Sequence, residues 1–282
     1  MARPGRGPHD EGRFVSAPAA EETGAGAPSG SSSAEPVVRR TRRLDRSLIV
    51  NPLIAVVGVV LVLLYAASQG LDDVEASVIN ASSLGERLGE HLVLTGLSTL
   101  VVIIVAIPAG IAISRPSAHR IQRPILAFTG FMQALPAFGV IVLLAFSPLG
   151  LGLPTAVVAL ALAALLPVLT NTVVGLQQVD KALIEASRGG GMSARQTLLR
   201  VELPLATPVM VAGVRVALVL NVGTAALATY VGAGGLGEPI KGMLELGRPT
   251  GTLVAATIVA ALALIVDWLA GLAEYAVRRN AG

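Results

Sequence analysis

The sequence predicts an all-α, polytopic integral membrane protein with six transmembrane helices and both termini in the cytoplasm. The first observation is composition: 53% of the 282 residues are hydrophobic, only 14% are charged, and the mean hydropathy is +0.73. Soluble domains are about 45–50% apolar and about 25% charged. The second is that six apolar stretches have the length of about 20 residues that a ~30 Å bilayer core requires. The third is that basic residues flank these stretches mainly on one side.

Residues 1–38 are predicted to be a disordered cytoplasmic tail. They are rich in Gly, Ala, Pro, Ser and Glu, and Phe14 is their one aromatic residue. Such a segment cannot bury enough apolar surface to offset the entropy of ordering it. No apolar stretch follows the first basic residues, so the segment does not have the pattern of a signal peptide.

The six predicted spans lack the alternation of a β-strand and are too long to be buried strands. They cover residues 48–67, 91–113, 125–146, 154–176, 208–229 and 251–273. We assign residues 39–90 to an extra N-terminal span with its outer loop, and residues 91–273 to a transmembrane core of five spans. Residues 274–282 are then a cytoplasmic C-terminus.

Basic residues predict the orientation of these spans. Fourteen Lys and Arg residues flank the spans on the side of both termini, and three flank them on the other side. Cytoplasmic segments carry such an excess of positive charge, so both termini are expected in the cytoplasm. The calculated pI of about 9.8 therefore indicates anchoring against membrane lipid, and no nucleic-acid partner is expected.

Three prolines, Pro108, Pro136 and Pro167, lie inside predicted spans. Each lacks a backbone donor and tends to kink its helix. In membranes such breaks persist where neighbouring helices or water satisfy the freed groups. The kinks serve either local packing or a path for a substrate between the helices.

The longest cytoplasmic connection between spans, residues 177–207, is predicted to be a helix, a break and a second helix. Three glycines at 189–191 end the first helix, and Ser193 with Gln196 forms a capping box that starts the second. Leu203 precedes Pro204, which disfavours helical geometry and is expected to end that helix. Thr207 is then expected to cap the fifth span, with Pro208 at its first position.

The same loop carries a spaced set of residues. They are Glu185, Ala186, Ser187, Gly191, Val201, Leu203 and Pro204. This set resembles the EAA motif of ABC importer permeases, E-A-A-x3-G-x9-I-x-L-P, with Ser187 in place of the second alanine and Val201 in place of the isoleucine. The resemblance implies that this loop docks into a cleft of an ATPase subunit. An ordinary amphipathic loop helix would not explain the glycine spacing or the final Leu-Pro.

Within that family the chain is most similar to permeases for osmoprotectants such as glycine betaine, choline, carnitine and proline betaine. The stretches that carry this likeness are residues 133–136, 166–172, 201–206, 221–228 and 232–237. The resemblance implies an importer in a bacterial plasma membrane. Its partners would be ABC ATPase subunits, a second permease chain (the same chain or a similar paralogue) and an extracytoplasmic substrate-binding protein.

Alternatives remain open at this point. The chain could serve an importer of another small solute, such as an amino acid or a sulfonate, or it could be a non-transporting scaffold that recruits a soluble partner. It is not expected to be an enzyme, because it has neither a nucleophile–base pair within its spans nor a P-loop sequence, so ATP hydrolysis would fall to a partner. No cofactor and no metal site are expected. There is no cysteine, and the three histidines fall in the tail and on opposite sides of the membrane.

Polar residues inside the spans are functional candidates, because a charge at the bilayer centre costs at least about 2.5–3.5 kcal/mol. Arg215 and Asp267 lie at comparable depths, and either pair with each other or extend separately to the interface. Asn221 and Thr224 are one helical turn apart and, with Gln133, either line a translocation path or bond neighbouring helices.

Aromatic residues form only 3% of the chain. Quaternary ammonium ligands are held by aromatic cages through cation–π attraction. The residues 232–237 match G-x-G-x-x-G but follow a membrane span, so a tight turn is expected there instead of a dinucleotide site. We therefore expect this subunit to pass a substrate on without binding it tightly, and tight recognition to belong to a separate binding protein.

Overall fold

The computed structural model describes residues 47–70 and 72–280, and within these ranges all regular structure is helical. The predicted tail at residues 1–38 and the arginines between residues 39 and 46 lie outside the described residues. The prediction of an all-helical fold is confirmed for the described part of the chain.

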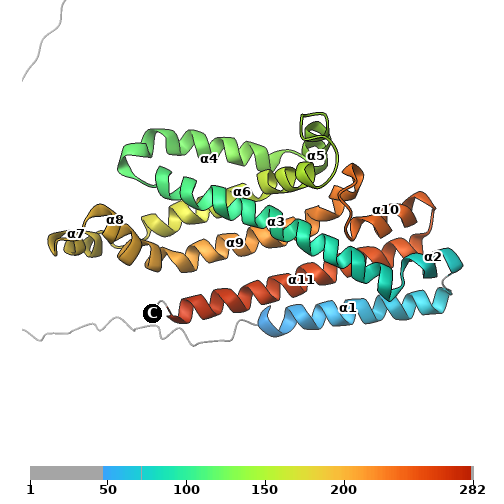
Figure 1. The fold of residues 1–282 in the computed structure, drawn as a ribbon. Helices are drawn as coiled ribbons and strands as arrows, with labels where there is room; N and C mark the ends of the chain where they lie inside the picture. Colours follow the sequence, from blue (N-terminus) through green and yellow to red (C-terminus); the bar gives the residue numbers. More distant parts are fainter. Residues whose placement is uncertain (1–46, 71, 281–282) are drawn as a thin grey trace, which may run out of the picture. The chain divides into compact units, whose positions relative to one another are not determined.

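Five long helices form the body of the fold. They are α1 (Ser47–Gln69), α3 (Ala81–Ile113), α6 (Leu153–Gln177), α9 (Leu203–Ala225) and α11 (Pro249–Asn280). Each of them, α9 together with its flanking turns, is long and apolar enough to cross a membrane. They run alongside one another, with α3, α6 and α9 packed together and α1 lying along α11 (Figure 1).

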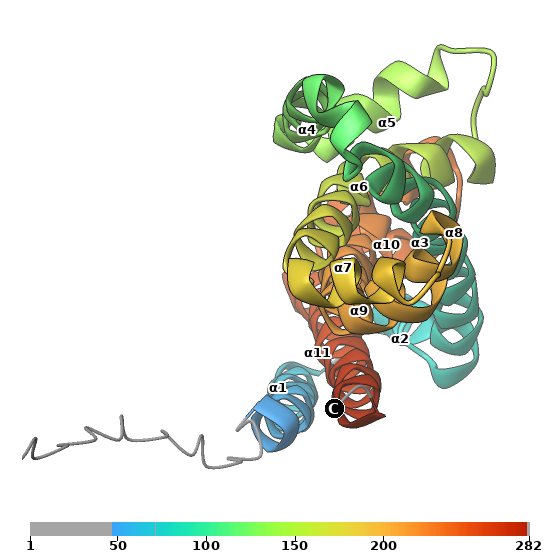
Figure 2. The same cartoon turned by 90° about the vertical axis from the view of Figure 1, so that its left-hand side faces the viewer.

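Shorter elements join the long helices. They are α2 (Asp73–Val78), η1 (Pro116–Ala118), α4 (His119–Ala134), α5 (Ala137–Ala145), α7 (Lys181–Gly189), α8 (Ala194–Thr197), the π-helical turn η2 (Leu198–Glu202), η3 (Ala226–Val231) and α10 (Gly237–Glu245). Seen along the bundle, α4 and α5 lie on one side of it and α1 lies on the opposite side, beyond α11 (Figure 2). The helices α7 and α8 and the C-terminal end of α11 share one end of the bundle, and α2 and α10 share the other (Figure 1).

The predicted third span, residues 125–146, is not one straight helix. The helices α4 and α5 meet at an angle of 93°. The break lies at Leu135, whose φ of −68° and ψ of 139° are extended, because the ring of Pro136 disfavours helical geometry in the residue before it. The described residues thus contain five helices able to span a membrane, or six if this bent pair is one broken span.

One expectation for residues 177–207 was wrong. Leu203 and Pro204 do not end the second helix of this loop, and Thr207 does not cap the fifth span. The chain stays helical from α8 through η2 into α9. Leu203 keeps helical angles and donates its N–H to the carbonyl of Leu198, five residues back. The wider π turn accommodates a residue that cannot donate, so Pro204 is tolerated at the start of α9. Thr207 instead donates its hydroxyl to the Leu203 carbonyl, 2.7 Å away.

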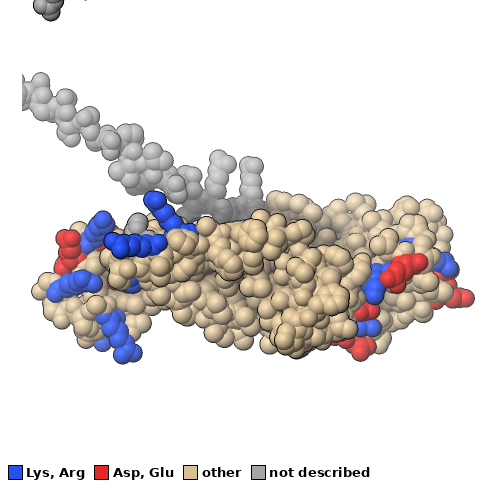
Figure 3. Space-filling model, turned by 90° about the horizontal axis from the view of Figure 1, so that it is seen from above, with Lys and Arg blue, Asp and Glu red and all other residues tan. Residues whose placement is uncertain are grey.

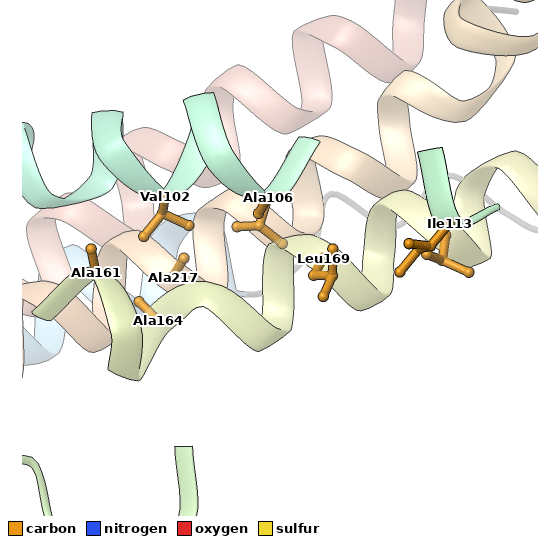
Figure 4. Packing of buried hydrophobic residues seen from close by; sticks show 9 residues of the cluster. Val102, Ala106, Ile113, Ala161, Ala164, Leu169 and Ala217 are labelled. Carbon is orange, nitrogen blue, oxygen red and sulfur yellow. The ribbon is translucent and has the colours of Figure 1, made fainter. Parts of the chain in front are cut away.

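Small side chains allow α3, α6 and α9 to approach closely. Val102 and Ala106 of α3 pack with Ala161 and Ala164 of α6 and Ala217 of α9 (Figure 4). Small residues at helix interfaces let backbones come together and gain dispersion contacts, which drive helix association in membranes.

Candidate functional site

Charged side chains gather at the two ends of the bundle, and the middle of the visible face carries none (Figure 3). Lys and Arg predominate at the end where α7 and α8 lie, and acidic residues are more frequent at the opposite end. An uncharged band between charged ends is what a bilayer core requires, because charged groups are costly inside it.

The helix α7 ends at the glycines, as the sequence predicted. Asp180 caps it, because a side-chain oxygen of Asp180 accepts the N–H of Ala182 at 2.9 Å. Just beyond the other end, Gly191 has a φ of +87°, a backbone conformation that residues with a side chain rarely adopt. The turn is closed by Met192, whose N–H donates to the Ser187 carbonyl at 3.1 Å.

The second helix of the loop begins at the predicted capping box. The backbone N–H of Ser193 donates to Oε1 of Gln196 at 2.8 Å, and the N–H of Gln196 donates to the Ser193 hydroxyl at 3.3 Å. The exposed residues of the predicted motif include Glu185 and Ala186 on α7 and Gly191 at its end. These three residues are therefore accessible to another molecule.

The last three residues of the motif lie on η2 and at the start of α9, next to an ion pair whose carboxylate is buried. Glu202 is 4% exposed, and its Oε2 lies 2.8 Å from an Nη atom of Arg115, just beyond the end of α3. Val201 and Leu203 flank this carboxylate and are half-buried, and Pro204 is exposed. The loop is thus connected by charge to α3 and by continuous helix to α9. Sequence reasoning missed this pair, although Glu202 was visible as the one acidic residue between two apolar motif positions.

Arg215 and Asp267 are brought together. Nε of Arg215 donates to Oδ1 of Asp267 at 2.6 Å, and Nη2 donates to Oδ2 at 2.8 Å, which is the bidentate geometry of the strongest ion pairs. Two further partners were not foreseen. Glu274 accepts from Nη1 of Arg215 at 3.1 Å, and Asn51 of α1 donates to Asp267 Oδ2 at 2.6 Å. One cluster therefore joins α1, α9 and α11.

The three polar residues considered for a path differ in their burial, and the two on α9 also differ in their bonding partners. Asn221 is fully buried, and its Nδ2 donates to the hydroxyl of Thr99 on α3 at 3.0 Å. Thr224 is half-buried and donates to the Leu220 carbonyl of its own helix at 2.7 Å. Gln133 is exposed on α4, just before the break. Asn221 thus bonds one helix to another, as polar side chains commonly do between membrane helices.

The glycine-rich segment after α9 is a tight turn, as expected, and α3 holds it in place. Gly234 and Gly235 both have positive φ angles, of +77° and +88°. The N–H of Gly235 donates to Oε2 of Glu90 at 2.8 Å. The buried ring of His91 accepts the Leu236 N–H on Nδ1 at 3.3 Å, and its Nε2 lies 2.9 Å from the Val222 carbonyl. A Cβ on Gly234 would lie 2.5 Å from the Glu90 carboxylate, so this position requires glycine.

Helices that can cross a membrane, an uncharged middle and an exposed helical loop at the basic end define a polytopic membrane protein. Residues 106–279 match the family model described as binding-protein-dependent transport system inner membrane component. This match covers more than half of the chain, so the chain belongs to that family.

Relatives and solved structures agree with this assignment. The chain is 39% identical over 214 residues to the osmoprotectant import permease protein OsmY of Salmonella typhimurium, covering 76% of this chain and 89% of the relative. It is 35% identical over 196 residues to the glycine betaine/carnitine/choline transport system permease protein OpuCB of Bacillus subtilis, covering 69% and 88%. The fold is similar to a chain of the MetNI methionine ABC transporter in an inward-facing conformation, with a TM-score of 0.61, 24% identity and coverage of 69% of this chain and 95% of that one.

The chain is therefore an inner-membrane permease subunit of an ABC importer, as the sequence motif predicted. Permeases of this family work with ATPase subunits and a substrate-binding protein.

Proposed function

We propose that this chain is the permease subunit of an ATP-driven, binding-protein-dependent importer of quaternary-ammonium osmoprotectants such as glycine betaine, choline, carnitine or proline betaine. The observation that carries the substrate class is the likeness to relatives named for osmoprotectant, glycine betaine, carnitine and choline transport, which are 34–39% identical. The chain itself is proposed to hydrolyse no ATP, and the partner subunits supply that step.

The proposed topology has six spans, with α4 and α5 as one broken span and both termini in the cytoplasm. Its support is the excess of Lys and Arg at the end of the bundle that holds α7, α8 and the end of α11. The proposed organisation is a cytoplasmic tail (1–38), an extra span with its outer loop (39–90), the permease domain (91–273) and a cytoplasmic C-terminus (274–282).

The segment 177–207 is proposed to be the ATPase-coupling loop. The residues assigned to coupling are Glu185, Ala186, Ser187, Gly191, Val201, Leu203 and Pro204. Exposure of α7 supports docking, and the Arg115–Glu202 ion pair supports transmission of movement to α3, because a loop held by a short charge-assisted contact moves with its helix. A docked ATPase shifts the permease between states only if it binds them with different free energies.

The assembly is proposed to contain two ATPase subunits, a second permease chain and an extracytoplasmic binding protein. The second permease is either another copy or a similar paralogue. Gln133, Asn221 and Thr224 remain candidates for a translocation path at the centre of that assembly, and Arg215 with Asp267 is proposed as an intramembrane ion pair.

Uptake by cells with and without this chain, at high osmolarity, tests the substrate. The panel is labelled glycine betaine, choline, carnitine, methionine and a sulfonate, and uptake of one or more quaternary-ammonium compounds should disappear on deletion. Loss of methionine uptake alone would favour an amino-acid importer, for which the MetNI likeness is the supporting observation. Loss of no solute would favour a scaffold.

The coupling loop is tested by Glu185→Lys, with Glu86→Lys as the matched control. Both glutamates are exposed, but Glu86 lies on α3 at the opposite end of the bundle. Glu185→Lys should abolish uptake and co-purification of the ATPase at normal membrane abundance, and the control should preserve co-purification. Unchanged uptake in Glu185→Lys would reject the coupling role.

A further inference from the structure

Two aromatic rings and one ammonium group from three different elements meet at the end of α9. The rings of Phe138 on α5 and Tyr230 on η3 lie edge to face, with centroids 5.1 Å apart and an angle of 78° between their planes. Nζ of Lys241 on α10 lies over the Tyr230 ring, 5.5 Å from its centroid. This distance is within the ~6 Å over which a ring attracts a cation.

The ring is open to other cations because its present occupant is held weakly. Phe138 and Tyr230 are 44% and 46% exposed. The other charged partner of Lys241 is Glu245, whose Oε1 lies 4.0 Å away and which is largely exposed. Exposed ion pairs of this kind contribute little. Lys241 can therefore leave the ring and remain beside Glu245.

The residue whose ammonium lies over the Tyr230 ring is a lysine and not an arginine. Lysine occurs at only two positions in the whole chain, and arginine supplies the other basic residues. A guanidinium is planar and stacks on rings, whereas an ammonium is a compact charge on a flexible stem. An ammonium therefore resembles the head group of a quaternary-ammonium solute more closely and is displaced from the ring more easily.

A hollow with two carboxylates is lined in part by the turn that follows η3. It has a volume of about 550 Å³, and its lining includes Gly232, two residues after Tyr230, together with Glu90, Glu238 and Arg87. Two carboxylates and one guanidinium leave a net negative charge. Such a lining raises the local concentration of cations.

We propose that Tyr230 and Phe138 form a transit site for the quaternary ammonium group of the solute, and that Lys241 occupies this site until the solute displaces it. This inference rests on the proposed substrate class. The quaternary ammonium group takes the place of the ammonium over the Tyr230 ring, and Lys241 stays beside Glu245. Two rings make a weaker site than a full aromatic cage, which suits a subunit that must release what it receives.

Fluorine NMR of the purified full-length chain, labelled with fluorotyrosine, tests the site directly. The chain has three tyrosines, and Tyr65 and Tyr275 serve as internal controls because they are 47% and 46% exposed, almost the same as Tyr230. Each resonance is assigned by a Tyr→Phe variant. Titration with tetramethylammonium chloride, at constant ionic strength, should shift the Tyr230 resonance saturably and leave the other two unchanged.

Removal of the competing ammonium group of Lys241 should raise the affinity of the site for tetramethylammonium. In Lys241→Met the tetramethylammonium concentration at half-saturation should fall about two- to fivefold, because the internal cation no longer competes. Lys241→Arg keeps a cation that can stack on the ring, so this matched control should not lower the half-saturation concentration. Equal shifts of all three tyrosines, or no saturable shift of Tyr230 in both the unaltered chain and Lys241→Met, would overturn the proposal.

A transport measurement separates this inference from the proposed function. In the assembled transporter, Tyr230→Leu should lower the maximal rate of choline uptake at least threefold with KM unchanged, because the binding protein sets KM, and Tyr230→Phe should retain the rate. Choline uptake by Tyr230→Leu at the unaltered rate would refute the transit site. If the unaltered transporter carries no quaternary-ammonium solute, the proposed function fails, and the NMR titration still decides whether Tyr230 binds such a cation.

Discussion

Replacing Asp267 with asparagine is expected to lower the free energy of unfolding by about 2–3 kcal/mol. The side chain of Asp267 accepts two hydrogen bonds from Arg215 and one from Asn51. Hydrogen bonds to charged groups contribute about 1.5–3 kcal/mol each and neutral ones about 0.5–1.5 kcal/mol. An asparagine has one neutral amide oxygen where Asp267 has two charged carboxylate oxygens. It can therefore replace at most one of the two hydrogen bonds from Arg215. Arg215 keeps Glu274, but that carboxylate also serves Arg278, so the guanidinium loses its main partner.

The expected loss of stability in Asp267→Asn is smaller than the loss that follows when one partner of a fully buried ion pair is removed. The side chains of Arg215 and Asp267 are 26% and 21% exposed, so solvent and the interface screen part of the interaction. Truncating one partner of a fully buried pair costs about 3–5 kcal/mol, which sets the upper limit.

The assay is detergent-induced unfolding of the purified chain, followed by the fluorescence of Trp268, its one tryptophan. The matched control is Asp73→Asn, an exposed carboxylate at the start of α2, which should change stability by less than about 0.5 kcal/mol. A double-mutant cycle with Arg215→Gln should give a coupling energy of about 1–3 kcal/mol. A coupling energy near zero, or equal effects of the two asparagine variants, would refute this account of the cluster.

Three further changes have defined outcomes in the same unfolding assay. Gly191→Ala should cost about 1–2 kcal/mol, because Gly191 has a φ of +87°. Glu202→Gln should cost about 1–3 kcal/mol, because it leaves the partly buried guanidinium of Arg115 without its carboxylate. Gly213→Ala should cost about 1–3 kcal/mol, because the added Cβ would lie 2.6 Å from Cβ of Asn171.

Each of these three changes has a control of the same chemistry. The control for Gly191→Ala is Gly189→Ala, where the φ is ordinary and the added Cβ would have no atom within 4 Å. The control for Glu202→Gln is Glu86→Gln, which changes an exposed carboxylate. The control for Gly213→Ala is Gly223→Ala, where the added Cβ would also have no atom within 4 Å. If a control destabilises the chain as much as its partner variant does, the local explanation given for that variant is wrong.

Local rules predicted the turn between α7 and α8 correctly, because its structure depends on neighbouring residues. The capping box at Ser193 and the glycine that ends α7 require only short-range hydrogen bonds and one backbone conformation. The motif spacing that marked this loop is likewise a short-range pattern. Such features are readable from sequence without knowledge of the packed structure.

The same proline rule succeeded at Leu135 and failed at Leu203. Both residues precede proline, yet Leu135 is extended and Leu203 is helical. At Leu203 the π turn removes the need for a donor from the proline, and the buried Ala206 and Met210 continue the packed face of α9. Tertiary packing therefore decided between two conformations that the sequence rule alone could not distinguish.

Contacts between distant residues limited the prediction of the polar sites. Matching depths in two spans were enough to suggest that Arg215 meets Asp267. They could not indicate Asn51, which is 216 residues from Asp267, or the pairing of Asn221 with Thr99, 122 residues away. Helix spacing also placed Asn221 and Thr224 on one face, but only packing against α3 buries one and leaves the other half-buried.

The π turn at η2 also fixes a rotational relationship. Each residue of an α-helix turns the chain by about 100° about the helix axis. A π turn contains one extra residue. The chain segment that precedes η2 is therefore rotated by about 100° relative to its position in a continuous α-helix. Deletion of one residue from Leu198–Glu202 would leave the chain helical into α9. It would nevertheless turn α7 and α8 by about a quarter of a revolution about the α9 axis. The direction in which the exposed face of α7 points is thus set by the number of residues in this turn, independently of which residues α7 itself contains.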